Sequence, residues 1–315
     1  MELKICRPRS AALVCAIVAL LGVLMLAPAP ARAQGVAWTP LTPPERTGHS
    51  MAYDSARGVT VLFGGVFGNE YRNDTWEWDG TAWSLRAVTG PSARHWLAMA
   101  YDAARGVTVL FGGRNDTGYS SQTWEWDGTS WTERTVTGPS PRYGHAMAYD
   151  SVRGVTVLFG GNSSTEGTIG DTWEWDGTSW TQRTVTGPSA RIWHKMAYDS
   201  VRGVTVLFGG YTDNGSYIGG TWEWNGSAWA LRTSSGPTAR ANHGMAYDAA
   251  RGVTVLFGGE TNSGPSTQTW EWNGTAWTRR FVSGPPTGQS HAMAYDTVRG
   301  KTVNFTGNQV WEWDG

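Results

Sequence analysis

Cysteine is almost absent from this chain of 315 residues, and the only two, Cys6 and Cys15, lie near the N-terminus. The segment around them has basic residues, then an apolar run over 11–27, then a small-residue ending at Ala33. This order is typical of a secretory signal peptide, because the apolar run is short and ends in prolines. We expect residues 1–33 to be a signal peptide cleaved after Ala33. An uncleaved N-terminal anchor is the alternative.

The mature part of the chain, 34–315, then has no thiol, which excludes disulfides and thiol chemistry. It keeps 21 basic and 25 acidic residues and no run of Lys or Arg. This charge balance argues against nucleic acid or an anionic membrane as the main partner. We expect a secreted or periplasmic monomer that is stabilised by its core alone and is not inserted in a membrane after signal cleavage.

Segments of helical length are also missing from the mature part, and a repeat takes their place. Each copy contains four short extended segments, for example "HSMAYD", "VTVLFGG", "DTWEWDG" and "AWSLR". Asp-Gly or Asn-Gly joins the last two, which predicts a type I′ hairpin turn. Each copy is therefore expected to form a four-stranded antiparallel sheet. The copies begin near residues 49, 97, 145, 194, 243 and 291, and "MAYD" recurs in them at Met51, Met99, Met147, Met196, Met245 and Met293.

The tryptophan pattern predicts how the ring closes. Copies one to five each have "WEW" and a third Trp five residues later, whereas the sixth has only Trp311 and Trp313. The N-terminal segment 36–42, around Trp38, resembles the fourth strand of the other copies. We expect it to complete the sixth sheet and so close an all-β, six-bladed propeller. An open solenoid is the alternative, and it leaves this N-terminal strand unexplained.

The glycine pattern resembles the kelch-repeat family. In five copies a glycine pair follows "VLF" and precedes an aromatic strand and a later Trp, whereas the sixth copy reads Thr306-Gly307. The resemblance covers nearly the whole mature chain. It implies a secreted, bacterial-type kelch β-propeller similar to the central domain of galactose oxidase, and it implies no single function. The pairs begin at Gly64, Gly112, Gly160, Gly209 and Gly258.

The copies differ on one side only. Loops after the second and fourth strands share one face and vary, whereas the turns on the other face are nearly constant. Unconstrained drift explains this, and so does ligand binding by loops on a rigid scaffold. Five copies have an Arg five residues before the repeated Met, in a "PxxR" pattern that resembles the rim of the central opening in kelch propellers. These arginines predict a positive rim for an anionic or polyhydroxyl ligand, or they hold loop carbonyls or the repeated Glu. They are Arg46, Arg94, Arg142, Arg191 and Arg240.

Residues that repeat in every blade are interpreted as scaffold. A His precedes the repeated Met by two residues in all copies but the second, which has Leu97, and we expect structural histidines there rather than a metal ring. A Glu between two Trp needs a cationic partner. Candidates are the rim arginines or a second sixfold set. That set is Arg57, Arg105, Arg153, Arg202, Arg251 and Arg299, and the repeated acids are Glu77, Glu125, Glu174, Glu223, Glu271 and Glu312.

Two of the twenty tryptophans, Trp96 and Trp193, do not belong to this scaffold pattern, and each stands three residues before the repeated Met. Exposed aromatic rings beside amide and basic side chains suit a sugar or an aromatic ligand. Packing along blade edges is the alternative. The candidate ligand-binding residues at this position and beside it are His95, Trp96, Tyr143, Trp193, Asn242 and Gln289.

The resemblance also implies which kelch enzymes to test. Relatives of galactose oxidase use copper with a Tyr linked to a Cys, which a mature chain without Cys excludes. Nitrile-specifier relatives hold iron through "ExxxDxxxH", a spacing that is absent. Sialic-acid epimerases of this family need neither metal nor thiol, and no acid/base pair can be assigned. We expect a secreted, non-catalytic binding module without cofactor or metal, for a carbohydrate first or an extracellular protein second, at the variable-loop face around the channel. The alternatives are a sugar-converting enzyme similar to these epimerases and a scaffold without a specific ligand.

Overall fold

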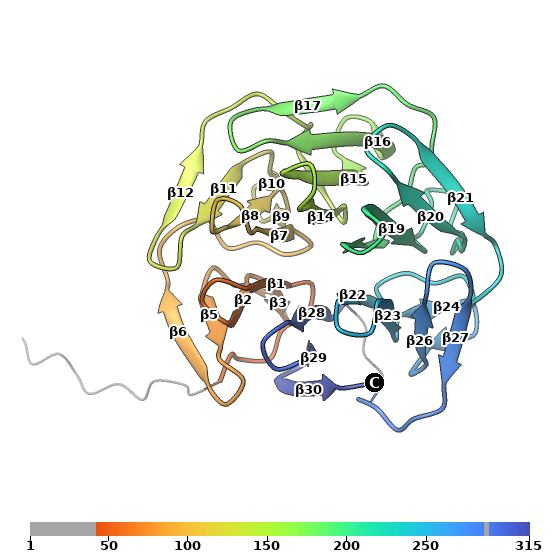
Figure 1. Cartoon of the computed structure of the whole chain (residues 1–315). Coiled ribbons are helices and arrows are strands. Elements are labelled where there is room, and N and C mark those ends of the chain that lie inside the picture. The colour runs from red at the N-terminus through yellow and green to blue at the C-terminus, as the bar shows by residue number, and fades with distance from the viewer. Residues whose placement is uncertain (1–41, 287–289) are drawn as a thin grey trace, which may run out of the picture. The chain divides into compact units, whose positions relative to one another are not determined.

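Residues 42–286 and 290–315 are described by the computed structural model of the chain. They form six antiparallel sheets arranged around a central axis, and no helix occurs among them (Figure 1). This confirms the predicted all-β class and the six-bladed propeller. The described residues accordingly include no helix long and apolar enough to cross a membrane. The signal peptide expected at 1–33 lies outside them.

Each blade runs from an innermost strand at the axis to an outermost strand at the rim, and β28–β30 are the strands described for blade 6. Blade 1 consists of β1 (Ser50–Asp54), β2 (Val59–Phe63), β5 (Thr75–Trp78) and β6 (Trp83–Ala87). Blade 2 consists of β7 (Ala98–Asp102), β8 (Val107–Phe111), β11 (Thr123–Trp126) and β12 (Trp131–Arg134). Blade 3 consists of β14 (Ala146–Asp150), β15 (Val155–Ser163), β16 (Gly167–Trp175) and β17 (Trp180–Arg183). Blade 4 consists of β18 (Lys195–Asp199), β19 (Val204–Phe208), β20 (Thr221–Trp224) and β21 (Trp229–Thr233). Blade 5 consists of β22 (Gly244–Asp248), β23 (Val253–Phe257), β26 (Thr269–Trp272) and β27 (Trp277–Arg280). Blade 6 has β28 (Ala292–Asp296), β29 (Lys301–Thr306) and β30 (Gln309–Trp313).

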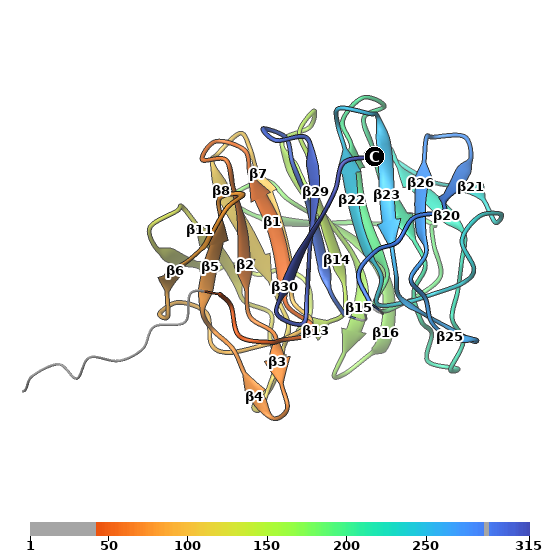
Figure 2. The same ribbon diagram turned by 90° about the horizontal axis from the view of Figure 1, so that it is seen from below.

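The loops after the second strands lie at one end of the propeller, as the topology predicts. Short strands form within these loops and in the loop that precedes β14, and β3, β4, β13 and β25 all lie at the lower end of the side view (Figure 2). These strands are β3 (Val66–Phe67), β4 (Glu70–Tyr71), β9 (Arg114–Asn115), β10 (Gly118–Tyr119), β13 (Arg142–Tyr143), β24 (Glu260–Thr261) and β25 (Gly264–Pro265).

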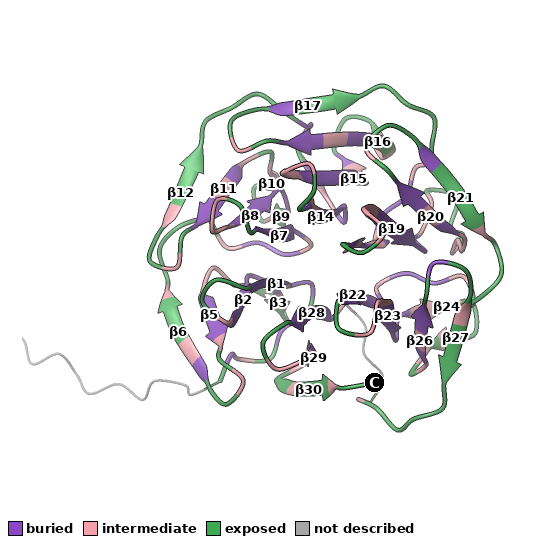
Figure 3. Cartoon of the chain, viewed as in Figure 1, coloured by how far each residue is buried: buried purple, intermediate pink, exposed green. Residues whose placement is uncertain are grey.

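The core lies between the blades. Inner strands are buried and outermost strands are largely exposed (Figure 3). Val61, Leu62 and Phe63 in β2 have no exposed surface, although their side chains point to opposite faces of the sheet, because a neighbouring blade covers each face. Blades 1 and 6 share one such cluster, in which Leu62 packs with Phe305. The described residues therefore close the ring through this interface.

The glycine pair that follows the second strand in blades 1–5 is required by its backbone and its surroundings, as blade 1 shows. Gly64 and Gly65 have φ of 73° and 102°, a region that favours glycine. A Cβ at Gly64 would lie 2.6 Å from the carbonyl oxygen of Arg94 in the next blade, and one at Gly65 would lie 3.0 Å from that of Thr47. The pair thus lets the loops of adjacent blades approach each other.

The repeated Trp of the fourth strand ties each blade to the one before it. Trp131 Nε1 in blade 2 donates to Thr75 Oγ1 in blade 1 at 2.7 Å, and its ring meets Phe63 edge-on at 5.2 Å between centroids. The next Trp residues make the same two contacts. These sets are Trp180 with Thr123 and Phe111, Trp229 with Thr172 and Phe159, and Trp277 with Thr221 and Phe208.

Between blades 5 and 6 a groove is lined by Phe257, Thr269 and Gly284. Phe257 and Thr269 are the blade 5 counterparts of the Phe and Thr that hold the Trp elsewhere. The segment 36–42, expected as the fourth strand of blade 6, lies outside the described residues except for Thr42. That this segment completes blade 6 stays a prediction.

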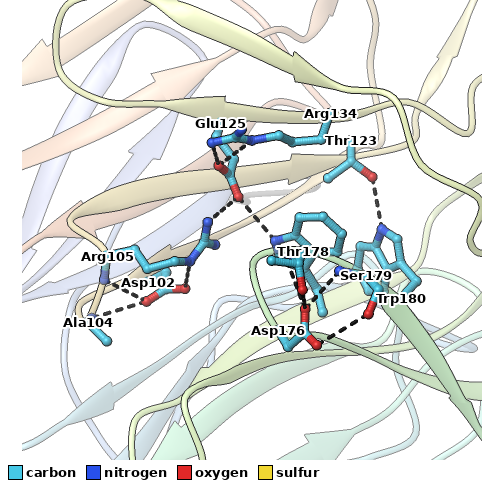
Figure 4. Close-up of polar contacts among 11 residues, drawn as sticks. Asp102, Ala104, Arg105, Thr123, Glu125, Arg134, Asp176, Thr178, Ser179 and Trp180 are labelled. Carbon is cyan, nitrogen blue, oxygen red and sulfur yellow. Dashed lines mark hydrogen bonds and ion pairs between the residues drawn. The ribbon is translucent and has the colours of Figure 1, made fainter.

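The repeated Glu of the third strand is the second tie between blades. Figure 4 shows Glu125 between Arg105 and Arg134. Its carboxylate accepts from Arg105 Nη1 at 2.5 Å, from Arg134 Nε at 2.8 Å and from Trp175 Nε1 of blade 3 at 3.1 Å. The partner of the repeated Glu is therefore the second sixfold arginine set rather than the rim arginines. The same set also pairs with the Asp that ends each first strand, for example Arg105 with Asp102.

The Glu network predicts a difference between a buried and a half-exposed copy. Glu174→Gln removes the charge that faces Arg153 and Arg183, and we expect it to lower the free energy of unfolding by about 2 kcal/mol. Glu312→Gln is the matched control, because its side chain is 30% exposed against 2% for Glu174, and it should cost much less. Urea unfolding measures both, and equal losses would contradict this account.

The fourth strand expected for blade 6 predicts the effect of removing Trp38. If 36–42 completes that blade, Trp38→Ala should lower the free energy of unfolding by about 3 kcal/mol, as expected for a buried Trp. Trp229→Ala, at the same position of blade 4, serves as the reference, and Trp38→Phe should lose less than Trp38→Ala. Unfolding identical to that of the unaltered protein would show that 36–42 is not part of the ring.

Candidate functional site

Six residues, one from each blade, form a closed ring of backbone hydrogen bonds around the axis. Each N–H donates to the carbonyl of the same position in the preceding blade, with N···O distances of 2.7–3.1 Å. All six have φ between 51° and 69°. The ring therefore links all six blades at the variable-loop end of the channel. Its members are Gly48, Trp96, Gly144, Trp193, Asn242 and Ser290.

Two ring members place indoles where a glycine would suffice. The left-handed conformation costs a residue with a Cβ about 1 kcal/mol, and Gly48 and Gly144 avoid this cost. A Cβ at Gly48 would lie 2.8 Å from Trp96 Cδ1, and one at Gly144 would lie 3.2 Å from Trp193 Cδ1. Each indole thus lies against the glycine of the preceding blade, and the centroids of the two indoles are 5.4 Å apart. Strained backbone that carries large side chains is a feature of functional sites.

The two indoles belong to a larger group, which we term the aromatic cluster. Trp96 stacks with His95 at 4.1 Å and with Tyr143 at 5.2 Å between centroids, and Trp193 lies 5.8 Å from Tyr211. Except for buried His95, its rings are partly exposed. All of them come from the variable loops of blades 1–4, so the cluster occupies one side of the face. Its members are Tyr71, His95, Trp96, Tyr119, Tyr143, Trp193, Tyr211 and Tyr217.

The five predicted rim arginines are buried under the loops. Arg46, with no exposed surface, donates from Nε to the carbonyl of Pro44 at 3.0 Å, from Nη1 to that of Gly64 at 3.0 Å and to Asp74 at 2.6 Å. The other four repeat the two carbonyl contacts. This arrangement matches the alternative in which these arginines hold loop carbonyls. Their guanidinium groups therefore do not form an open positive rim.

The repeated histidines pack between blades. His145 meets Phe111 of blade 2 edge-on at 5.5 Å between centroids. Burial lowers the pKa of His145 to about 3 and that of His95 to about 4, so both are neutral at pH 7. Among the described residues, no group of three or more His, Cys, Asp or Glu side chains is arranged to hold a metal ion.

Lys195 is a site residue that the sequence reasoning missed. It lines the small cavity beside the backbone ring, which Trp96 and Trp193 also line. It also lines a cavity of about 70 Å³ along the axis, where its neighbours are mainly methionines and alanines. Burial lowers its pKa to about 8, and no ion pair joins it to an acid among the described residues. A position-by-position comparison of the copies reveals it, because the other copies have small residues there. These are Ser50, Ala98, Ala146, Gly244 and Ala292.

Comparison with known proteins supports the repeat family. A family model described as the KLHDC2/KLHL20/DRC7 Kelch-repeats domain matches residues 24–176, a little under half of the chain. Match and fold together support a kelch-repeat propeller. Such propellers generally mediate protein interactions, which suggests an interaction module here. No curated protein matches the chain.

The propeller brings together part of the predicted site. His95, Trp96, Tyr143 and Trp193 meet in the aromatic cluster. Asn242 belongs to the backbone ring, where its N–H donates to the Trp193 carbonyl, and Gln289 lies outside the described residues. The tyrosines at 71, 119, 211 and 217 were not predicted, because each occurs at a different offset in a loop of different length.

Lys195 predicts a gain of stability on its removal. In the folded propeller its pKa, about 8, lies below the usual 10.5, so the folded state binds its proton less tightly than the unfolded chain does. The lowered pKa therefore reduces the free energy of unfolding by its full amount below pH 8, and this reduction disappears as the pH rises through 10.5. We expect Lys195→Ala to raise the free energy of unfolding by about 2 kcal/mol at pH 7. This is less than the whole pKa shift would give, because the side chain is partly exposed to solvent.

Unfolding measured at pH 7 and pH 10.5 checks this expectation, since the gain should shrink at the higher pH. Lys301→Ala is the control, because Lys301 is partly exposed and pairs with Asp314 at 2.7 Å. A loss of stability for Lys195→Ala at pH 7 would mean that the ammonium is stabilised in the folded protein.

Proposed function

We propose that this kelch propeller is an extracytoplasmic protein-interaction module that contacts its partner through the aromatic cluster. The observation that carries the proposal is the cluster itself, eight contiguous rings gathered on one side of the variable-loop face. Trp and Tyr are the side chains that most often dominate binding at protein interfaces. Because the cluster spans only four of the six blades, it gives a partner one preferred orientation.

The shape of the surface favours a protein over a carbohydrate. The cavity lined by Trp96 and Trp193 measures only about 20 Å³, whereas small-ligand sites are typically several hundred. Two rings already stack with Trp96, which leaves less of its face for a sugar. A loop-built surface with so small a cavity suits another protein. Nothing in the described residues favours a sugar-converting enzyme.

The extracytoplasmic part of the proposal rests on the sequence of residues 1–33. The basic start, short apolar run and Ala33 ending support export. A mature chain without cysteine can form no disulfide and has no thiol to oxidise, so it is compatible with either the periplasm or the exterior of the cell. A secreted bacterial-type kelch protein is the corresponding subtype.

The test removes both indoles without changing the ring. Trp96→Gly with Trp193→Gly installs the residue that blades 1 and 3 have naturally, so the left-handed backbone is kept. Photo-crosslinking from residue 217 in the exported fraction identifies a partner, whose affinity is then measured with purified proteins. We expect the double variant to bind at least 100-fold more weakly, as for the loss of two interface hot spots.

Val152→Ser with Val201→Ser is the control, because both valines are exposed in the turns of the opposite face. It should bind as the unaltered protein does. A partner whose affinity is the same for the double indole variant contradicts the proposal. A glycan array run in parallel covers the other ligand class, since saturable binding lost in the same variant would identify a carbohydrate instead.

A further inference from the structure

Blades 1 and 3 pair the buried rim arginine with a carboxylate in the same manner. Asp171 accepts from Arg142 Nη1 at 2.6 Å and from Nη2 at 2.9 Å, and it also accepts from Trp173 Nε1 at 2.6 Å. Asp74 makes the same three contacts in blade 1. In blades 2 and 5 the amide oxygens of Gln122 and Gln268 accept from the arginine instead. In four blades, therefore, the residue just before the third strand offers a side-chain oxygen to the guanidinium.

Blade 4 has Gly220 at this position. Arg191 donates from Nε to the carbonyl of Ser189 at 2.9 Å, from Nη1 to that of Gly209 at 2.9 Å and from Nη2 to Ser189 Oγ at 3.2 Å. Since a guanidinium has five N–H groups, one on each Nη remains for a further acceptor. These are the two nitrogens that the aspartate binds in blades 1 and 3. Arg191 is only 2% exposed, burial lowers its pKa to about 10, and no acid pairs with it among the described residues.

A pocket of about 630 Å³ opens beside this arginine, a volume suited to a small organic molecule. A Cβ at Gly220 would lie 3.7 Å from Trp222 Nε1 and 3.4 Å from Leu231 Cδ1. The missing acceptor position thus faces both an indole N–H and an apolar wall. The wall continues with Ile218, and Ser234 and Ser235 supply hydroxyl groups at the edge.

We propose that blade 4 binds a small organic acid at this pocket. The carboxylate of the ligand takes the place of the aspartate of blades 1 and 3, accepts two N–H bonds from Arg191 and one from Trp222 Nε1, and the apolar body packs on Leu231 and Ile218. Arginine is suited to this task, because its planar fork matches the two oxygens of a carboxylate. The pocket shares no residue with the aromatic cluster, so this site does not depend on the proposed protein interaction.

The test uses 4-fluorobenzoate and its neutral analogue 4-fluorobenzamide, titrated into the purified protein and followed by ¹⁹F NMR. We expect saturable binding of the acid and at least tenfold weaker binding of the amide, because only the acid presents two acceptor oxygens and a charge. Arg191→Lys keeps the charge and loses the fork, and it should weaken the acid at least tenfold. Trifluoroacetate, which lacks the apolar body, should bind more weakly than 4-fluorobenzoate.

Gly220→Asp is the decisive variant, because it supplies within the chain the carboxylate that blades 1 and 3 have. We expect it to abolish binding of 4-fluorobenzoate while the protein still unfolds cooperatively. Asp tolerates the positive φ of 85° at this position better than most residues. Val201→Ser, on the opposite face, should leave binding unchanged. Equal binding of acid and amide, unchanged binding in folded Gly220→Asp, or no saturable binding of either fluorinated acid would each overturn the proposal.

Discussion

Every blade of this propeller can bury its two faces only against its two neighbours, and the rest of the structure follows from that constraint. Apolar side chains on both faces of β2 need two neighbouring blades, and the carboxylate of Glu125 takes a hydrogen bond from Trp175 of the next blade. The Trp131–Thr75 hydrogen bond and the His145–Phe111 contact also join neighbouring blades, at other distances from the axis. Stability is therefore a property of the closed ring rather than of a blade.

Because the repeated residues serve these interfaces, functional chemistry is to be sought where one blade departs from the others. Trp96 and Trp193 replace glycine in the backbone ring, Lys195 replaces a small residue in the channel, and Gly220 replaces an acceptor beside a buried arginine. Three of these departures lie in blade 4 or at its start. Each has a local cost, namely a left-handed Trp backbone, a partly buried ammonium or an incompletely paired guanidinium.

The aromatic cluster and the blade 4 pocket use the scaffold differently. The cluster is broad and shallow, since its rings lie on one another across four blades, and it offers contact area to a large partner. The pocket is local, because one blade omits a side chain that four others supply, and it offers a charge and an apolar wall to a small ligand. A rigid ring can hold both, since neither requires a change in the interfaces between blades.

The number of blades, the order of strands in the repeat and the identity of the scaffold residues could be predicted from the amino-acid sequence, because a period of 48 or 49 residues with alternating apolar strands has few solutions in space. It also placed Trp96 and Trp193 as departures. The folded protein was needed to show that Arg46 and its counterparts are buried, that the repeated Glu pairs with Arg105 and its counterparts, and that Tyr211 contacts Trp193. These outcomes depend on which segments, separated by about 20 residues or more in the sequence, meet in the folded chain, and periodicity does not encode those contacts.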